Sequence, residues 1–130
     1  MTYSLDKLPR FLLPKGMDSF EVSELKFEPV ATMGRKDSSI AWLFKSEEPD
    51  GCAAAIIRYA PGNVRPPHKH PGAEIIYVLE GEMKNSQGVL RKGDLALYPT
   101  GSSHQSSSEV GCTILMVWER LIRMDIPEEK

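Results

Sequence analysis

The chain has 130 residues, of which 41% are hydrophobic and 26% charged, a composition typical of one globular domain with its own core. A net charge of -2 and interspersed acidic and basic residues argue against a nucleic-acid-binding surface. Apolar runs are too short for a membrane span or a signal peptide, so we expect a cytoplasmic protein that binds neither nucleic acid nor membranes.

Short runs rich in β-branched and aromatic residues, separated by Gly, Pro, Asn and Ser, indicate strands rather than helices. The prolines fall mostly at the borders of these runs, as expected because proline is excluded from strand interiors. In chain order, a weak edge strand is predicted at 20–30 and clearer strands at 39–44, 53–60, 74–81, 94–99 and 112–118. This spacing predicts an all-β, antiparallel sandwich or barrel formed by a single domain over residues 1–130.

The two ends of the chain carry no recognisable chemistry. Residues 1–35 are expected to form an N-terminal arm over a sheet edge, an edge strand, or a strand lent to a neighbouring subunit. The tail, 119–130, is compatible with a final strand or a short helix. The two cysteines, Cys52 and Cys112, are expected to be buried apolar groups in a reducing compartment rather than a disulfide.

Titratable residues cluster in the segment PPHKHPGAEIIYVLEG, residues 66–81. His68 and His70 are two positions apart, so in an extended segment both side chains point to one face. The Pro71–Gly72 bend then allows Glu74 to return to that face. A solvated loop or a hydrogen-bonded cluster would also accommodate the three side chains. A divalent cation, however, would offset the cost of burying them in a barrel, since it accepts imidazoles and a carboxylate together.

The third histidine of the chain, His104, follows the predicted strand 94–99 and the turn TGSS. A second hairpin would bring it beside the first cluster. We therefore predict a metal site made of four side chains, namely His68, His70, Glu74 and His104.

The spacing of these residues resembles that of the cupins. The first cupin motif matches the run from Gly62 to Gly81, which includes His68-Lys69-His70 and Glu74. The second motif matches Gly93, Pro99-Thr100-Gly101 and His104, with Ser108 where the family usually has Asn. Within the cupins, the chain is similar to free-standing ChrR-type cupins and to acetylacetone-cleaving dioxygenases. The resemblance covers residues 52–118 and implies a β-jelly-roll barrel, frequently a homodimer.

The resemblance also implies one divalent metal ion per chain and a small-molecule substrate or ligand. Our leading hypothesis is a non-haem dioxygenase that acts on a β-dicarbonyl or similar enolisable compound, with Fe²⁺ favoured and the metal carrying the chemistry. Zn²⁺, Ni²⁺ or Mn²⁺ would suit the alternatives: a non-catalytic metal-binding sensor or small-molecule-binding cupin, or a metal-dependent lyase or isomerase. Candidate pocket-lining residues are Tyr59, Tyr77, Met83, Tyr98, Met116 and Trp118.

Overall fold

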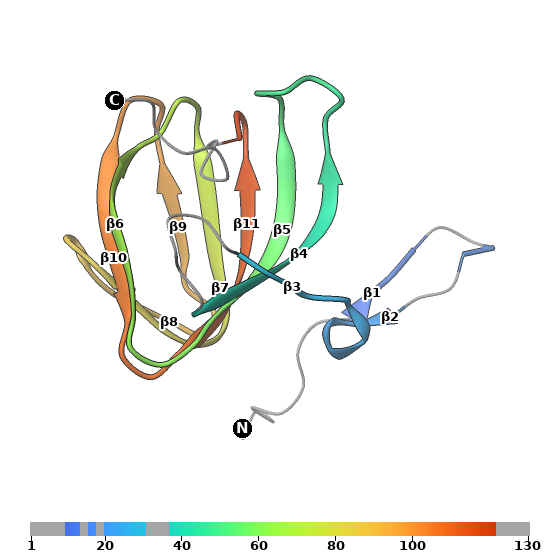
Figure 1. Cartoon of the computed structure of the whole chain (residues 1–130), viewed down its shortest axis with the longest axis horizontal. Coiled ribbons are helices and arrows are strands. Elements are labelled where there is room, and N and C mark those ends of the chain that lie inside the picture. The colour runs from blue at the N-terminus through green and yellow to red at the C-terminus, as the bar shows by residue number, and fades with distance from the viewer. Residues whose placement is uncertain (1–9, 14–15, 18–19, 31–36, 122–130) are drawn as a thin grey trace.

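A computed structural model describes residues 10–13, 16–17, 20–30 and 37–121 of the chain, and their regular secondary structure is almost entirely β (Figure 1). The predicted all-β class is confirmed. The strands are β1 Arg10–Phe11, β2 Phe20–Glu21, β3 Glu28–Pro29, β4 Ser38–Lys45, β5 Ala53–Tyr59, β6 Asn63–Lys69, β7 Glu74–Asn85, β8 Gly88–Arg91, β9 Leu95–Tyr98, β10 Ser103–Ser108 and β11 Cys112–Trp118.

The main sheet is antiparallel, with strand order β3-β4-β5-β11-β7-β10-β6, and β8 and β9 also pair with β7. It curls so that β6 and β10 stand opposite β4 and β5, which gives an open barrel (Figure 1). Short β1 and β2 pair with each other to one side. The barrel interior is therefore bounded by strands from both halves of the chain.

Strand β7 connects the two halves of this barrel. Its first residues pair with β9 and β11, whereas Lys84 and Asn85 pair with β10. The change of partner follows a register shift between Thr113 and Ile114 on β11, where β7 contains an extra residue. Gly81 follows at φ +78, and a side chain there would overlap the carbonyl oxygen of Gly111. The bulge and the glycine together allow β7 to bend around the barrel.

Apolar side chains form two clusters on opposite faces of the sheet, as period-2 alternation requires. The inner cluster fills the barrel and consists of Ala53, Ala55, Ile57, Tyr59, Ile76, Val78, Met83, Tyr98, Cys112, Ile114, Met116 and Trp118. The outer cluster is centred on Val22, Ile56 and Leu79. Residues Phe11, Leu25 and Phe27 pack against it, so the described N-terminal segments cover the outer face of the barrel.

The prediction of one strand over residues 20–30 is wrong. Two short strands, β2 and β3, are separated there by a 3₁₀ helix, η1, Val22–Glu24. The backbone N–H of Glu21 donates to the Glu24 carboxylate at 2.6 Å, in a capping box that favours a turn. The apolar residues alternate as in a strand, but Val22 lies in the 3₁₀ helix and packs into the outer cluster from there.

Beyond the N-terminal segment, three strands were not predicted, namely β6, β8 and β10. Both cysteines are free, as expected; Cys112 is buried as predicted, but Cys52 is exposed, so its predicted burial is wrong. Most of the predicted C-terminal element, residues 122–130, lies outside the described residues.

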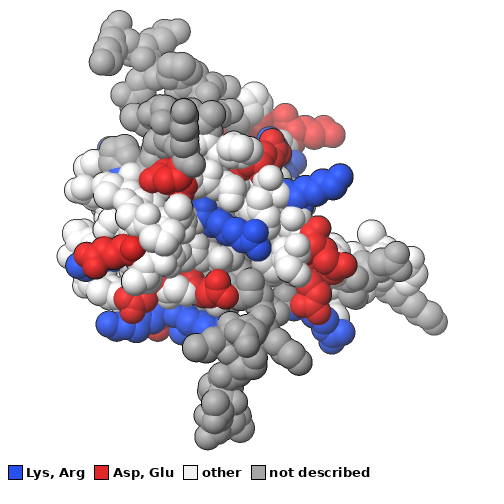
Figure 2. Space-filling model, turned by 60° about the horizontal axis from the view of Figure 1, so that its bottom comes forward, with Lys and Arg blue, Asp and Glu red and all other residues white. Residues whose placement is uncertain are grey.

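Charged side chains of both signs are interspersed on the face of the molecule seen in Figure 2. This distribution agrees with the mixed charges along the sequence. In the part of the chain that the structure describes, no helix is long and apolar enough to cross a membrane.

Candidate metal centre

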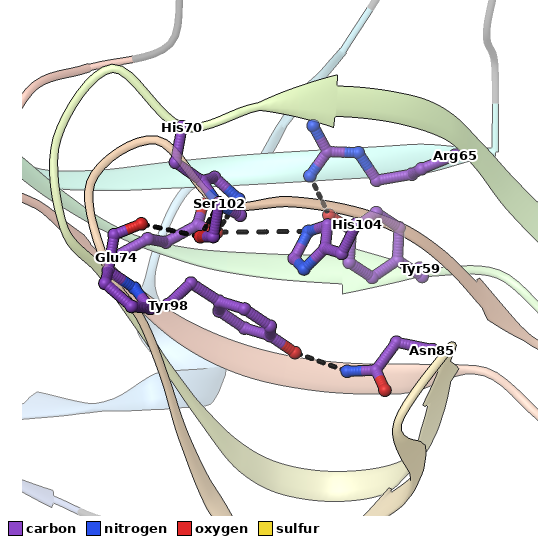
Figure 3. A network of polar contacts seen from close by, with 9 residues as sticks. Tyr59, Arg65, His70, Glu74, Asn85, Tyr98, Ser102 and His104 are labelled. Carbon is purple, nitrogen blue, oxygen red and sulfur yellow. Dashed lines mark hydrogen bonds and ion pairs between the residues drawn. The ribbon is translucent and has the colours of Figure 1, made fainter.

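The four predicted ligands meet inside the barrel, although they come from three strands and a turn. His68 lies near the end of β6, His70 just after it, Glu74 at the start of β7 and His104 in β10. Each offers one donor atom, and these atoms all lie within 4.8 Å of one another. The side chains of His70, Glu74 and His104 are almost fully buried, and His68 is half-buried. Figure 3 shows His70, Glu74 and His104 converging from different segments.

The pairing of β6 with β10 sets the positions of the histidines. His68 is directly opposite His104, but Ser106 is opposite Arg65, so β6 carries one extra residue between these pairs. This bulge falls at the two prolines, which cannot donate ladder hydrogen bonds. It reverses the alternation along β6, and as a result His68 and Arg65 both face the barrel interior although they are three positions apart.

Glu74 is the only carboxylate among the described residues of this cluster. Its Oε2 atom lies 2.7 Å from Nε2 of His70 and 3.9 Å from Nε2 of His104. The first residues of β7 keep Glu74, Ile76 and Val78 on the inner face. The three side chains therefore share one face of the strand, and the acid is fixed at the rim of an apolar core.

Ser102 determines the tautomer of His70. The Ser102 hydroxyl donates to the carbonyl oxygen of Pro99 at 2.6 Å, so its single proton is already used. It lies 2.9 Å from Nδ1 of His70 and must accept from an Nδ1–H group. In the neutral ring, the lone pair is then on Nε2, the atom that faces Glu74. This is the arrangement that a metal-ligating histidine needs.

Several buried polar atoms of the cluster have no hydrogen-bond partner among the described residues. They are Nε2 of His70, Nδ1 of His104 and both carboxylate oxygens of Glu74. Unsatisfied polar atoms at this depth are costly, and a lone pair 2.7 Å from a carboxylate oxygen is repelled by it. A cation bound by these atoms would remove both penalties, so the donor set fits a divalent metal ion.

The electrostatics of His104 favour its neutral form. Burial lowers the pKa of this ring from 6.5 to about 4, and the neighbouring His68, His70 and Arg65 contribute, while Glu74 opposes the shift. A neutral imidazole is the form that binds a metal. At neutral pH, His104 therefore needs to release no proton before it can act as a ligand.

An aromatic ring, that of Tyr98, bounds the cluster on one side. The Tyr98 ring lies 4.3 Å from that of His104 and 5.3 Å from that of His70, between centroids. The Tyr98 hydroxyl accepts a hydrogen bond from the side-chain amide of Asn85. Burial is the main reason that the pKa of Tyr98 is raised, with the charge of Glu74 second. Tyr98 is thus a neutral, oriented wall of the site.

Five of the six candidate pocket residues lie in the inner cluster: Tyr59, Met83, Tyr98, Met116 and Trp118. Tyr77 packs against the outer cluster instead. It is adjacent in sequence to the inward-facing Ile76 and Val78 and therefore points to the opposite face. The structure thus brings Tyr98 to the metal ligands and places Tyr77 away from them.

Sequence reasoning missed two polar residues of this site, Arg65 and Ser102. Arg65 is only 8% exposed, and its guanidinium donates to the Tyr59 hydroxyl at 2.9 Å (Figure 3). Its position between a turn and two prolines gave no sign that it faces inward. The only sequence signal for Ser102 is its place inside the second cupin motif, two residues before His104.

Comparison with known proteins agrees with the resemblance seen in the motifs. A family model described as the ChrR Cupin-like domain matches residues 16–121. Germin-like protein subfamily 2 member 4 from Arabidopsis thaliana is 41% identical over 64 residues, covering 42% of this chain and 29% of that protein. The chain therefore spans less than a third of the length of this curated relative.

The solved structures that share the fold include an anti-sigma protein and an RmlC-like cupin. The complex of Rhodobacter sphaeroides SigE with the anti-sigma ChrR gives a TM-score of 0.62 at 20% identity, covering 75% of this chain and 51% of that chain. An RmlC-like cupin from Shewanella frigidimarina gives a TM-score of 0.63 at 21% identity, covering 80% of this chain and 90% of that chain. At this identity the likeness concerns the fold alone, and it confirms the predicted cupin jelly roll.

Proposed function

Because this chain belongs to the family of ChrR cupin-like domains, we propose that it is a metal-dependent dioxygenase acting on a small β-dicarbonyl or similar enolisable compound. The observation that carries the proposal is the convergence of four donor atoms within 4.8 Å of one another. Three of the four side chains are almost fully buried, so the donors are held in place before any ion binds.

The donor set supports a metal that keeps positions open for other ligands. Three imidazoles and one carboxylate leave one or two coordination positions of a five- or six-coordinate ion. When bound, a redox-active ion such as Fe²⁺ would supply Lewis acidity and electron exchange with dioxygen. The chain itself holds the donors, orients His70 through Ser102 and the Tyr98 wall through Asn85, and surrounds the cluster with apolar side chains that exclude water.

The accessible side of the cluster lies at His68. This residue is half-buried, whereas His70, Glu74 and His104 are almost fully buried. A small chelating molecule would therefore approach past the His68 ring and meet Tyr98 and the inner cluster beyond it. Such a wall selects small, flat, partly apolar compounds.

The direct test is oxygen consumption. The protein is reconstituted anaerobically with Fe²⁺, mixed with a panel of β-diketones and exposed to dioxygen. We expect uptake that requires both iron and a diketone and that is lost in H104Q. The matched control is Q105N, a change of an exposed neighbour on β10. Iron binding without uptake for any compound would contradict the proposal.

A second candidate is a metal-binding sensor or small-molecule-binding cupin without catalysis. The description of the matching family and the fold shared with an anti-sigma protein favour it. If this candidate is correct, we expect tight zinc binding, ligand binding without turnover, and no effect of dioxygen on the bound ligand. Turnover that needs the metal but not dioxygen would instead indicate a lyase or isomerase.

We further propose that the chain forms a homodimer. Among the described strands, β9 pairs with β7 alone, and its side chains Leu95 and Leu97 are more than half exposed. An apolar edge strand of this kind is commonly covered by a second copy. Elution as a monomer in sizing chromatography combined with light scattering would refute this assembly.

A further inference from the structure

The side-chain amide of Asn85, at the end of β7, has a fixed orientation. Its Oδ1 atom accepts hydrogen bonds from the backbone N–H groups of Gln87, at 2.9 Å, and of Gly88, at 3.2 Å. These contacts hold the carbonyl side of the amide against the hairpin that joins β7 to β8. The NH₂ side therefore faces the other way, where it donates to the Tyr98 hydroxyl.

The Tyr98 hydroxyl is left with a proton that has no acceptor. Its oxygen accepts from the Asn85 NH₂ group, and an NH₂ group cannot accept a hydrogen bond in return. The side chain of Tyr98 is buried, and the part of the chain that the structure describes offers this proton no other partner. Because a buried O–H group without an acceptor is costly, the hydroxyl favours a bound molecule that supplies one.

A second unused donor lies on the other side of Glu74. In the sheet register, Glu74 on β7 is opposite Tyr98 on β9 and opposite Trp118 on β11. The Nε1–H group of Trp118 is buried and has no hydrogen-bond partner among the described residues. Tyr98 and Trp118 both belong to the inner cluster. Two donors without acceptors therefore flank the carboxylate of the metal centre on the inner face of the barrel.

We propose that Tyr98 is a residue that determines specificity by donating a hydrogen bond to the bound molecule, and that the substrate is a β-dicarbonyl compound with a third oxygen beyond the two that chelate the metal. This inference rests on the proposed function and assigns a substrate class to the same centre. Trp118 supplies a second donor for a molecule of this oxygen-rich kind.

The position of Tyr98 suits this contact. Its ring centroid lies 4.3 Å from that of His104 and 5.3 Å from that of His70, and its hydroxyl extends from the ring toward Asn85 (Figure 3). A molecule that chelates an ion at these histidines would lie along the Tyr98 ring, and an oxygen beyond the chelate would meet the hydroxyl. An apolar group in the same place would leave the O–H proton unpaired, and this penalty gives the selectivity.

The test compares heptane-2,4-dione with heptane-2,4,6-trione, two probes of equal chain length that differ in one carbonyl oxygen. Each is titrated into the Co²⁺-loaded protein, and binding is followed by the visible spectrum of the metal. Because the probes also differ in acidity, the quantity compared between variants is the ratio of their two affinities. We expect Y98F to lower the preference for the trione about tenfold. Y77F is the matched control, because Tyr77 packs against the outer cluster, and it should keep the wild-type ratio.

A second variant, N85D, separates hydrogen bonding from packing. Its carboxylate can still accept from the backbone N–H groups of Gln87 and Gly88, but it has no N–H group to donate. It would therefore accept the proton of the Tyr98 hydroxyl, which could then no longer donate to the bound molecule. We expect N85D to lose the preference for the trione as Y98F does, although the Tyr98 ring and its packing are retained.

The outcomes separate this inference from the proposed function. An affinity ratio that is unchanged in Y98F, or that falls in Y98F but not in N85D, would overturn the role of Tyr98 as a donor. A ratio that falls in both variants, together with no oxygen uptake by the iron form with either probe, would keep this donor and reject the dioxygenase. Failure of the wild type to bind Co²⁺, or to bind either probe, would overturn both proposals. Melting temperatures before metal addition show whether each variant folds, and N85D alone decides if Y98F does not.

Discussion

Removal of one hydroxyl outside the ligand set should weaken metal binding. Ser102 accepts a hydrogen bond from Nδ1–H of His70 at 2.9 Å and donates to the carbonyl of Pro99 at 2.6 Å. In S102A, the buried Nδ1–H loses its acceptor, and the ring can flip or change tautomer. The lone pair on Nε2 is then no longer fixed toward Glu74.

The structure sets the size and the selectivity of this effect. Loss of a hydrogen bond that orients a ligating histidine typically lowers metal affinity about 10- to 100-fold, or roughly 1.4 to 2.7 kcal/mol. The fold should survive, because two backbone hydrogen bonds hold the same segments together: His70 N–H donates to Ser102 at 2.8 Å, and Gly101 N–H donates to His70 at 2.9 Å. The neutral hydrogen bond itself contributes only about 1 kcal/mol to stability.

The assay is competition for Zn²⁺ or Co²⁺ with a chromophoric chelator. S103A is the matched control, because Ser103 is adjacent in the chain but exposed, and its affinity should equal that of the wild type. S102T retains a hydroxyl and should recover part of the loss. If S102A binds metal within about twofold of the wild type, Ser102 does not orient His70 and the tautomer assignment is incorrect.

Three further outcomes follow from the site and the fold. Saturation with Zn²⁺ should raise the melting temperature, because binding at a thousandfold excess over Kd adds about 4 kcal/mol to the free energy of unfolding. A chelator should reverse this increase. Equal melting temperatures with and without the metal would contradict a specific site. In the metal-free protein, the pKa of His104 is lowered from 6.5 to about 4, so the unfolded chain takes up this proton at a higher pH than the folded protein does. The free energy of unfolding should therefore fall by roughly 3 kcal/mol as the pH drops from 6.5 toward 4. Denaturant titrations at each pH should show a flatter profile for H104Q, and an unchanged pH dependence in this variant would refute the assignment. G81A places a side chain at φ +78 against the backbone of Gly111 and should lower the free energy of unfolding by on the order of 3 kcal/mol. G62A, at φ +85 in open space, should lower it by only about 1 kcal/mol. Equal melting temperatures of the two variants would show that β7 can bend without Gly81.

The sequence identified the strands whose own residues favour extended structure. β5 and β11 are apolar runs that start where predicted and end within one residue of the predicted limits. The spacing of the two motifs also identified the four side chains that converge, because glycine, proline and ligand positions are local features of the chain. Both results depend on interactions within short segments.

The strands β6 and β10 were not predicted because their sequences do not favour strands. β6 is NVRPPHK and β10 is SHQSSS, with prolines in one and polar residues throughout the other. They are extended because they pair with each other, His68 opposite His104. The tertiary pairing supplies the backbone hydrogen bonds that their own composition would not secure.

The sequence by itself therefore determined an all-β domain with three histidines and a glutamate at the spacing of a metal site. Only the tertiary structure decided that Arg65 faces the same interior and that Ser102 fixes the His70 ring. The physical reason is that a bulge reverses the alternation of side chains, and its position depends on the partner strand. Contacts such as His70 with Ser102 join residues 32 positions apart, and no local pattern encodes them.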